Sequence, residues 1–295
     1  MSRIEEALFK AAQRRHQKTS HKQDASLEAA ATGPVKRDSF PAGAPDLRVK
    51  IEDSTLVSAL DPSSFIAEEY RKCKELLIKK TFGAGKFRNT VMVTSSLQGE
   101  GKTTTCLNLA ISLAREYDFT VLLMDTDLRK PSCAERLGLG KLPGLSECLL
   151  GNADVGDLLV RTGIGKLVLL PAGTPPPNPA ELLASHKMRG LIQEMKSRYA
   201  DRYILMDTPP LLPFSETRTM ARIVDGVLLV IREGCSSLDN LADATELLKD
   251  KEIFGIIYND AHMDAGSPLS YWDNYGYASY HNGATPKRQL TRSTE

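Results

Sequence analysis

The sequence predicts an α/β fold: a doubly wound, mostly parallel sheet with helices on both faces. From Lys86 onward, short and almost continuously apolar runs alternate with helical patterns, and such runs are typical of parallel strands buried on both faces. With 41% apolar and 25% charged residues among 295, the composition is that of a globular protein. We expect strands at residues 90–95, 120–125, 167–171, 203–207, 226–232 and 253–258, and helices near 63–81, 102–117, 178–200, 215–223 and 237–250.

The chain is expected to have three parts. Within residues 1–55, the apolar spacing of the first twelve predicts an amphipathic helix, with a frayed terminal helix as the alternative. The rest of this part is interpreted as a flexible, mildly basic linker, because it has too few apolar side chains to offset its ordering entropy. The domain then spans 56–260, where Asp61-Pro62-Ser63-Ser64 can cap its first long helix. Residues 261–295 form a polar, tyrosine-rich tail.

Charge and composition argue against several classes of protein. Lys and Arg (38) nearly balance Asp and Glu (37), and a net charge of +1 disfavours a nucleic-acid binder that depends on a global positive field. No apolar run approaches the ~18–20 residues of a membrane span, and the first residues lack the apolar core of a secretory signal. The five cysteines are far apart, which disfavours a disulfide framework or zinc site and favours the cytoplasm.

A phosphate-binding loop follows the first expected strand. Its residues Ser96-Leu97-Gln98-Gly99-Glu100-Gly101-Lys102-Thr103 match the Walker A pattern, with Ser96 in place of the first glycine. The glycines let backbone N–H groups turn toward phosphate oxygens, and the helix that follows adds its positive end. A glycine turn that only joins strand to helix is the alternative. We expect ATP to be bound by Gly99, Glu100, Gly101, Lys102, Thr103 and Thr104, with Lys102 at the β- and γ-phosphates and Thr103 on Mg²⁺.

Three aspartates are expected beside this loop. Asp125 ends the second strand, Asp127 follows it, and Asp207 ends the fourth. The carboxyl ends of parallel strands meet at the edge of the sheet where ligands bind, so these carboxylates should lie together. Because carboxylate oxygens are good Mg²⁺ ligands, the sequence predicts a magnesium site here, although any one aspartate could be a solvated turn residue.

The phosphate loop, Asp125-x-Asp127-x-Arg129 and Asp207-Thr208-Pro209-Pro210 together resemble the bacterial tyrosine kinases (BY-kinases), over residues 60–280. These enzymes serve polysaccharide synthesis and export, and their P-loop NTPase fold is of a deviant Walker type related to partition ATPases. Gln98 stands where the family often has proline. The resemblance implies an ATP-dependent protein-tyrosine autokinase. Asn259, which follows the last strand, is expected to read the adenine edge or to be a plain turn residue.

The resemblance also implies roles for individual residues. Lys102 and Mg²⁺ would neutralise the migrating phosphoryl group. Thr103 and Asp207 would hold the ion, with Asp125 adjacent and acting through water. We expect Asp127 to accept or orient the proton of the tyrosine hydroxyl.

Four of the nine tyrosines lie within ten residues of the tail, at Tyr271, Tyr275, Tyr277 and Tyr280. BY-kinases carry their autophosphorylation sites in such a cluster, so these four are the expected phosphate acceptors; an aromatic tail that packs on a partner is the alternative. Residues 261–270 reach at most ~35 Å when extended, which permits entry into a neighbour's active site or the chain's own. Each phosphate adds about −1.5 to −2 charges, which should expel the tail and separate subunits.

The first long helix carries Glu68, Arg71 and Lys74 where BY-kinases have Glu-x-x-Arg-x-x-Arg, a motif that pairs subunits in a ring. A local surface ion pair is the alternative. BY-kinases act with a transmembrane activator of the polysaccharide co-polymerase type, fused or separate. For this chain we expect a separate activator, a cytoplasmic location at the inner face of the plasma membrane, and a protein-tyrosine phosphatase as a further partner.

Two other functions are compatible with the fold. A partition or septum-type P-loop ATPase normally carries a second lysine where this chain has Leu97. A non-catalytic, ATP-dependent scaffold would keep Lys102 and Asp207 but would need no acceptor tyrosine. Labelled ATP separates the three functions, because the label would end on tyrosine, in free phosphate, or in neither.

Overall fold

The computed structural model describes residues 49–83, 86–198 and 201–261. The helix and most of the linker expected before residue 49 lie outside the described residues. The tail from residue 262 onward, with its four expected acceptor tyrosines, lies outside them as well.

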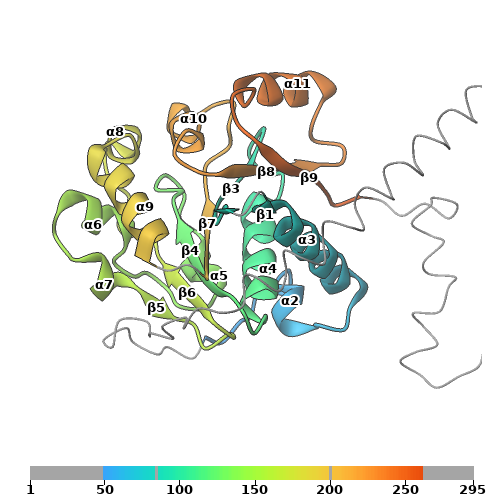
Figure 1. Ribbon diagram of the computed structural model, residues 1–295, viewed down its shortest axis with the longest axis horizontal. Coiled ribbons are helices and arrows are strands. Elements are labelled where there is room, and N and C mark those ends of the chain that lie inside the picture. The colour runs from blue at the N-terminus through green and yellow to red at the C-terminus, as the bar shows by residue number, and fades with distance from the viewer. Residues whose placement is uncertain (1–48, 84–85, 199–200, 262–295) are drawn as a thin grey trace, which may run out of the picture. The chain divides into compact units, whose positions relative to one another are not determined.

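A seven-stranded sheet forms the centre of the domain, with the strand order β5-β6-β4-β7-β3-β8-β9 (Figure 1). All neighbouring strands are parallel except β5, which pairs with β6 in the antiparallel direction. The mostly parallel α/β fold that the sequence predicts is therefore confirmed. The strands are β3 (Thr90–Ser95), β4 (Thr120–Asp125), β5 (Val160–Arg161), β6 (Leu167–Leu170), β7 (Arg202–Asp207), β8 (Gly226–Arg232) and β9 (Ile253–Asn259), and a separate hairpin joins β1 (Phe82–Gly83) to β2 (Lys86–Phe87).

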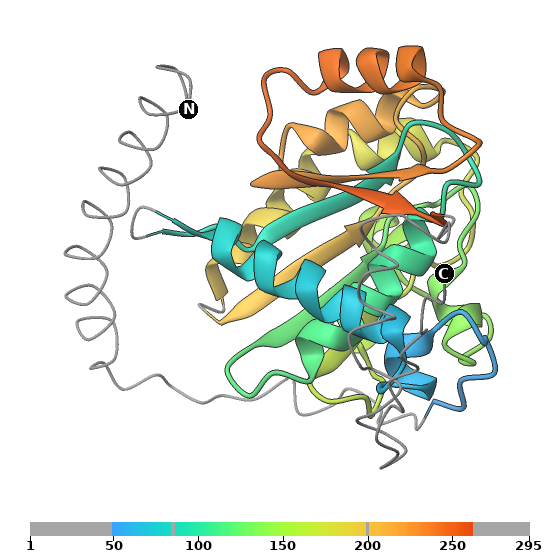
Figure 2. The same ribbon diagram turned by 90° about the vertical axis from the view of Figure 1, so that its right-hand side faces the viewer.

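Helices cover both faces of this sheet (Figures 1 and 2). Helix α4 packs directly against β3, β4 and β7 on one face and is itself covered by α2 and α3, while α9 and α10 contact the other face. Strands β3 and β7 are buried along their whole length for this reason, and the residues in the middle of each are mostly apolar. The helices are α2 (Val57–Leu60), α3 (Phe65–Thr81), α4 (Lys102–Ala114), α5 (Cys133–Arg136), α6 (Leu145–Leu150), α7 (Val155–Leu158), α8 (Pro179–Leu183), α9 (His186–Arg198), α10 (Ser215–Ala221) and α11 (Leu238–Leu247).

The single helix predicted over 178–200 is wrong, because the structure divides it into α8 and α9. The chain leaves the helical path at Ala184 and Ser185. The Ser185 hydroxyl oxygen then accepts a hydrogen bond from the backbone N–H of Met188, at 3.2 Å. Serine is a favourable residue at a helix start, because its side chain satisfies an N–H group that has no partner within the helix.

Residues 49–55, which the sequence assigns to the linker, pack on the domain instead. Val49 and Ile51 contact the hydrophobic core, and the Asp53 carboxylate accepts a hydrogen bond from Arg136 Nε at 2.6 Å. Leu56, the next apolar residue, is fully buried. The low apolar content of this segment did not predict that it would pack. Two apolar side chains and one ion pair attach it to the domain.

Candidate active site

The phosphate loop lies between β3 and α4, and its two glycines both have the left-handed backbone conformation. The φ angle is 88° at Gly99 and 91° at Gly101, a region that side-chain-bearing residues rarely adopt. The Glu100 side chain is fully buried beneath the loop, where its carboxylate accepts hydrogen bonds from the Leu97 backbone N–H, at 2.7 Å, and from the Ser236 hydroxyl. Glu100 therefore stabilises the loop through its side chain, and phosphate could contact only its backbone.

Asn259, at the end of β9, contacts the phosphate loop. Its Nδ2 donates a hydrogen bond to the Glu100 carbonyl oxygen at 3.0 Å. A Cβ atom added to Gly101 would lie 2.0 Å from that same Nδ2. A glycine is therefore required at position 101 by both backbone conformation and close approach. The contact gives Asn259 a role in positioning the loop, and its expected reading of the adenine edge stays a prediction.

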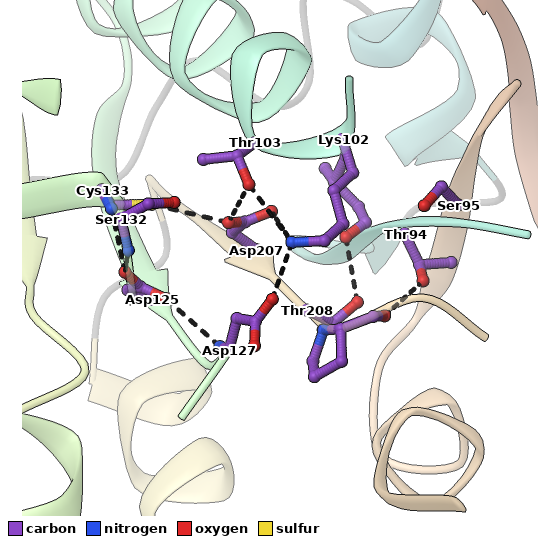
Figure 3. Close-up of polar contacts among 12 residues, drawn as sticks. Thr94, Ser95, Lys102, Thr103, Asp125, Asp127, Ser132, Cys133, Asp207 and Thr208 are labelled. Carbon is purple, nitrogen blue, oxygen red and sulfur yellow. Dashed lines mark hydrogen bonds and ion pairs between the residues drawn. The ribbon is translucent and has the colours of Figure 1, made fainter. Parts of the chain in front are cut away.

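Lys102 and the aspartates converge at the carboxyl edge of the sheet, as Figure 3 shows. Lys102 Nζ lies 2.9 Å from Asp127 Oδ2 and 3.6 Å from Asp207 Oδ1. Thr103 Oγ1 donates to Asp207 Oδ2 at 2.7 Å. Burial would lower the pKa of Lys102, but the charges of Asp207 and Asp127 outweigh burial and raise it. The lysine is therefore held as a cation, paired with the two carboxylates Asp127 and Asp207.

Asp125 organises the segment that follows β4. Its Oδ1 accepts a hydrogen bond from the Asp127 backbone N–H at 3.2 Å, and its Oδ2 accepts from those of Ser132 and Cys133, both at 3.0 Å. Only 1% of Asp125 is exposed, and burial together with the nearby charge of Asp207 raises its pKa to about 7. The carboxylate shapes the loop that carries Asp127, because each of its oxygens binds backbone from that loop.

The residues present fit a magnesium ion. Asp125 and Asp207 face each other across neighbouring strands in register, and their carboxylate oxygens lie within 4.8 Å of each other and of Cys133 Sγ. Asp207 is fully buried, its Oδ1 has no hydrogen-bond partner among the described residues, and burial raises its pKa. A buried carboxylate oxygen in this state is suited to a cation, and the Thr103 hydroxyl supplies a second hard oxygen. The Cys133 thiol is not a ligand that Mg²⁺ prefers.

A cleft of about 470 Å³ opens above these groups. Its walls include the loop residues Gly99, Gly101, Lys102, Thr103 and Thr104, together with Asp127. The expected ATP-binding residues therefore lie together, apart from the buried Glu100 side chain and Asn259. Of the predicted catalytic carboxylates, Asp127 lines the cleft, and Asp207 contacts Lys102 and Thr103, which line it.

Two arginines of this cleft were not predicted. Arg136, in α5, donates to Thr104 Oγ1 at 2.9 Å, to Thr55 Oγ1 at 2.5 Å and to Asp53. Arg129, which the sequence shows only as part of a family motif, lies over the Phe214 ring with 4.8 Å between Cζ and the centroid, and pairs with Glu216. Both arginines line the cleft, and each is also paired with a carboxylate, Arg129 with Glu216 and Arg136 with Asp53.

The residues expected at a subunit interface make contacts within the chain. Arg71 Nε donates to Glu68 Oε2 at 2.5 Å, and Arg71 also binds the Pro62 carbonyl oxygen. Lys74 is only 8% exposed and pairs with Glu116, beyond the end of α4. Lys74 thus faces the domain itself, and its role in pairing subunits is not supported by this geometry.

None of the helices in the described part of the chain has the length and apolar character of a membrane span.

Comparison with known proteins assigns the family. A family model described as an AAA domain matches residues 89–252. Over 224 residues the chain is 33% identical to the tyrosine-protein kinase YwqD of Bacillus subtilis (strain 168). The aligned region covers 75% of this chain and 90% of YwqD. The chain belongs to the bacterial tyrosine kinase family. The resemblance stated from the three sequence motifs is thereby confirmed.

Solved structures agree with this assignment. The chimerical protein CapA2B2 is similar to this BY-kinase with a TM-score of 0.66 at 26% identity, covering 75% of this chain and 96% of that one. The septum site-determining protein MinD with Mg-ADP from Pyrococcus horikoshii OT3 has a TM-score of 0.51 at 25% identity, covering 63% and 76%. The P-loop NTPase fold is therefore common to the kinases and to the septum-type ATPases considered above.

Proposed function

We propose that this BY-kinase transfers the γ-phosphoryl group of ATP to tyrosines of residues 271–280, and that the accepting tail belongs to a neighbouring subunit. The observation that carries the proposal is the convergence of Lys102, Asp127 and Asp207 at one end of a cleft that the phosphate loop lines. Phosphoryl transfer depends mostly on positioning and charge neutralisation, and this cluster supplies both.

The loop and its lysine would hold the nucleotide. Backbone N–H groups of Gly99 to Thr104 and the N-terminal end of α4 would bind the phosphate oxygens. Lys102 would leave Asp127 for the β- and γ-phosphates, because a phosphate carries more negative charge than the carboxylate it replaces. Thr103 and Asp207 would hold Mg²⁺, with Asp125 acting through water; when bound, the ion neutralises charge on the phosphate oxygens.

Asp127 would then be free to act on the acceptor. A free tyrosine titrates near pH ~10, so its hydroxyl needs a base during attack. Asp127 is 6% exposed at the mouth of the cleft, and its Oδ1 accepts a hydrogen bond from the Lys130 backbone N–H at 3.1 Å. This bond would hold the carboxylate in place once Lys102 has moved, with Oδ2 directed at the acceptor hydroxyl.

The family membership supports further parts of this proposal. The kinase would regulate exopolysaccharide synthesis or export and form a homo-oligomer through the face that carries Glu68 and Arg71. A protein-tyrosine phosphatase would remove the phosphate from its tyrosines. A separate transmembrane activator of the co-polymerase type would bring it to the inner face of the plasma membrane.

A mixing experiment tests transfer between chains. Wild-type protein is incubated with MgATP and a Lys102→Ala chain that carries a mass tag, and phosphotyrosine is measured on the tagged chain. We expect the tagged chain to be labelled only when the wild type is present. Label confined to wild-type chains would contradict transfer between subunits, and free phosphate without phosphotyrosine would favour an ATPase.

A further inference from the structure

A second cavity, of about 280 Å³, lies beside the nucleotide cleft. We call it the acceptor pocket. Ser132 lines both spaces, so they are adjacent at this residue. Asp125 lines the acceptor pocket and Asp127 lines the cleft, which places the junction at the segment that follows β4. Most of the pocket wall is apolar, from Pro131, Ala134, Leu142, Pro171, Ala172 and Pro175.

One wall of the acceptor pocket is held by the start of α6. The backbone N–H groups of Leu145 and Ser146 donate to the carbonyl oxygens of Pro171 and Ala172, at 2.8 and 2.9 Å. The Glu147 carboxylate accepts a hydrogen bond from the Thr174 backbone N–H at 3.0 Å. Because these bonds fix the segment after β6, the wall is formed before any ligand arrives.

The opposite wall is held by Asp125. Its Oδ2 accepts the two hydrogen bonds from Ser132 and Cys133 that begin α5, and α5 carries Ala134 into the pocket. The same carboxylate therefore fixes this wall and, through its Oδ1, the backbone of Asp127. Asp125 thus positions both a wall of the pocket and the backbone of the proposed base.

We propose that the acceptor pocket binds the phenol ring of the acceptor tyrosine, supplied by residues 271–280, with the hydroxyl at the Ser132 end. The inference rests on the proposed function and adds the site that selects tyrosine. An aromatic ring buries a large apolar area in such a pocket, and its polar tip needs a wet, polar end, which the junction with the cleft supplies. A serine or threonine acceptor would leave the apolar walls unfilled.

The tail is long enough to extend from its own domain toward the pocket of a neighbouring chain. Strand β9 ends at Asn259 on the same edge of the sheet as the phosphate loop, and residues 261–270 span up to ~35 Å when extended. In the transfer step, the phenol oxygen forms a bond to the γ-phosphorus, the bond between that phosphorus and the β,γ-bridging oxygen breaks, and ADP leaves. The phenol proton passes to the Asp127 carboxylate and then to solvent.

Two variants that fill the pocket test this inference: Ala134→Leu from the α5 wall, and Thr174→Trp from the exposed rim. Ala242→Leu, on the exposed face of α11, is the matched control. All are made in the full chain with Tyr271, Tyr275, Tyr277 and Tyr280 changed to alanine, and a peptide of residues 268–283 serves as acceptor. Thermal melting and the binding of MgADP check that each variant is folded.

For both filling variants we expect kcat/KM for the peptide to fall at least about tenfold, mainly through KM, with the KM for ATP within about twofold of the parent. A peptide with phenylalanine at the four acceptor positions should compete with the substrate peptide on the parent, and a peptide with alanine there should not. Peptide kinetics unchanged in both folded variants would overturn the pocket assignment. If the parent itself labels no tyrosine, the proposed function fails, and binding of the phenylalanine peptide to parent and variants still decides the pocket.

Discussion

Replacing Gly101 by alanine should damage the phosphate loop more than replacing Gly99, although both residues have nearly the same backbone conformation. At Gly99, a Cβ would meet no atom within 4 Å among the described residues. At Gly101, a Cβ would lie 2.0 Å from Asn259 Nδ2 and 3.0 Å from its Cγ. The comparison therefore separates the cost of backbone strain from the cost of displacing Asn259.

The magnitudes follow from these contacts. A left-handed conformation costs a residue with a Cβ roughly 1–2 kcal/mol, which is the whole cost expected for Gly99→Ala. Gly101→Ala must also move Asn259, which breaks its hydrogen bond to the Glu100 carbonyl and costs a further ~0.5–1.5 kcal/mol. The sum for Gly101→Ala is about 1.5–3.5 kcal/mol. For a domain of this size, the difference of ~1 kcal/mol between the two variants corresponds to about 2–4 °C in Tm.

Urea denaturation and thermal melting of both single variants measure this difference, and Asn259→Ala completes the test. Once Asn259 has been shortened, Gly101→Ala should cost only the strain, so the two substitutions should be non-additive by the energy of the lost hydrogen bond. MgADP affinity should fall further for Gly101→Ala than for Gly99→Ala. Equal losses of stability in the two glycine variants, with an additive cycle, would show that Asn259 does not restrict position 101.

Three further predictions concern the surroundings of the site. Because burial raises the pKa of Asp125 from 3.8 to about 7, the protein without ligands should lose stability as the pH rises from about 4 to 7. Asp125→Asn should reduce this dependence of the unfolding free energy on pH, measured by urea denaturation. An unchanged dependence in the variant would argue against a raised pKa at Asp125. Burial favours the neutral form of Glu147, but hydrogen bonds from Gly144 and Thr174 outweigh it and lower its pKa from 4.5 to about 2. The free energy of unfolding should therefore decrease as the pH is lowered from about 4.5 to about 2. The Glu147→Gln variant should lose less stability than the wild type over this range. Arg136→Ala should release residues 49–55, seen as faster limited proteolysis there and weaker MgADP binding, whereas a digestion pattern like that of the wild type would contradict the contact.

The convergence of the aspartates could be predicted from the sequence because it depends only on strand order and direction. Asp125 and Asp207 each end an apolar run, and parallel strands bring such ends to one edge, where the structure places them in register. The phosphate loop was predictable for a similar reason, since its glycines and lysine are contiguous. Local sequence and sheet topology suffice for both.

Groups that reach the site from outside the sheet could not be predicted in this way. Arg136 lies in a four-residue helix with no periodicity to detect, and its contacts with Asp53 and Thr104 depend on tertiary packing. The acceptor pocket depends on the bonds between Glu147 and the segment after β6, which join parts of the chain far apart in sequence. The only local signal was the Gly144-x-x-Glu147 spacing of a capped helix start.

Phosphosite mapping of the full chain shows whether the kinase modifies its own tyrosine cluster. Purified protein is incubated with MgATP and digested, and phosphotyrosine is located by mass spectrometry in the wild type and in Lys102→Ala. We expect phosphate on Tyr271, Tyr275, Tyr277 or Tyr280 in the wild type and on none of them in the variant. ATP consumed by the wild type while all four tyrosines remain unmodified would contradict this expectation.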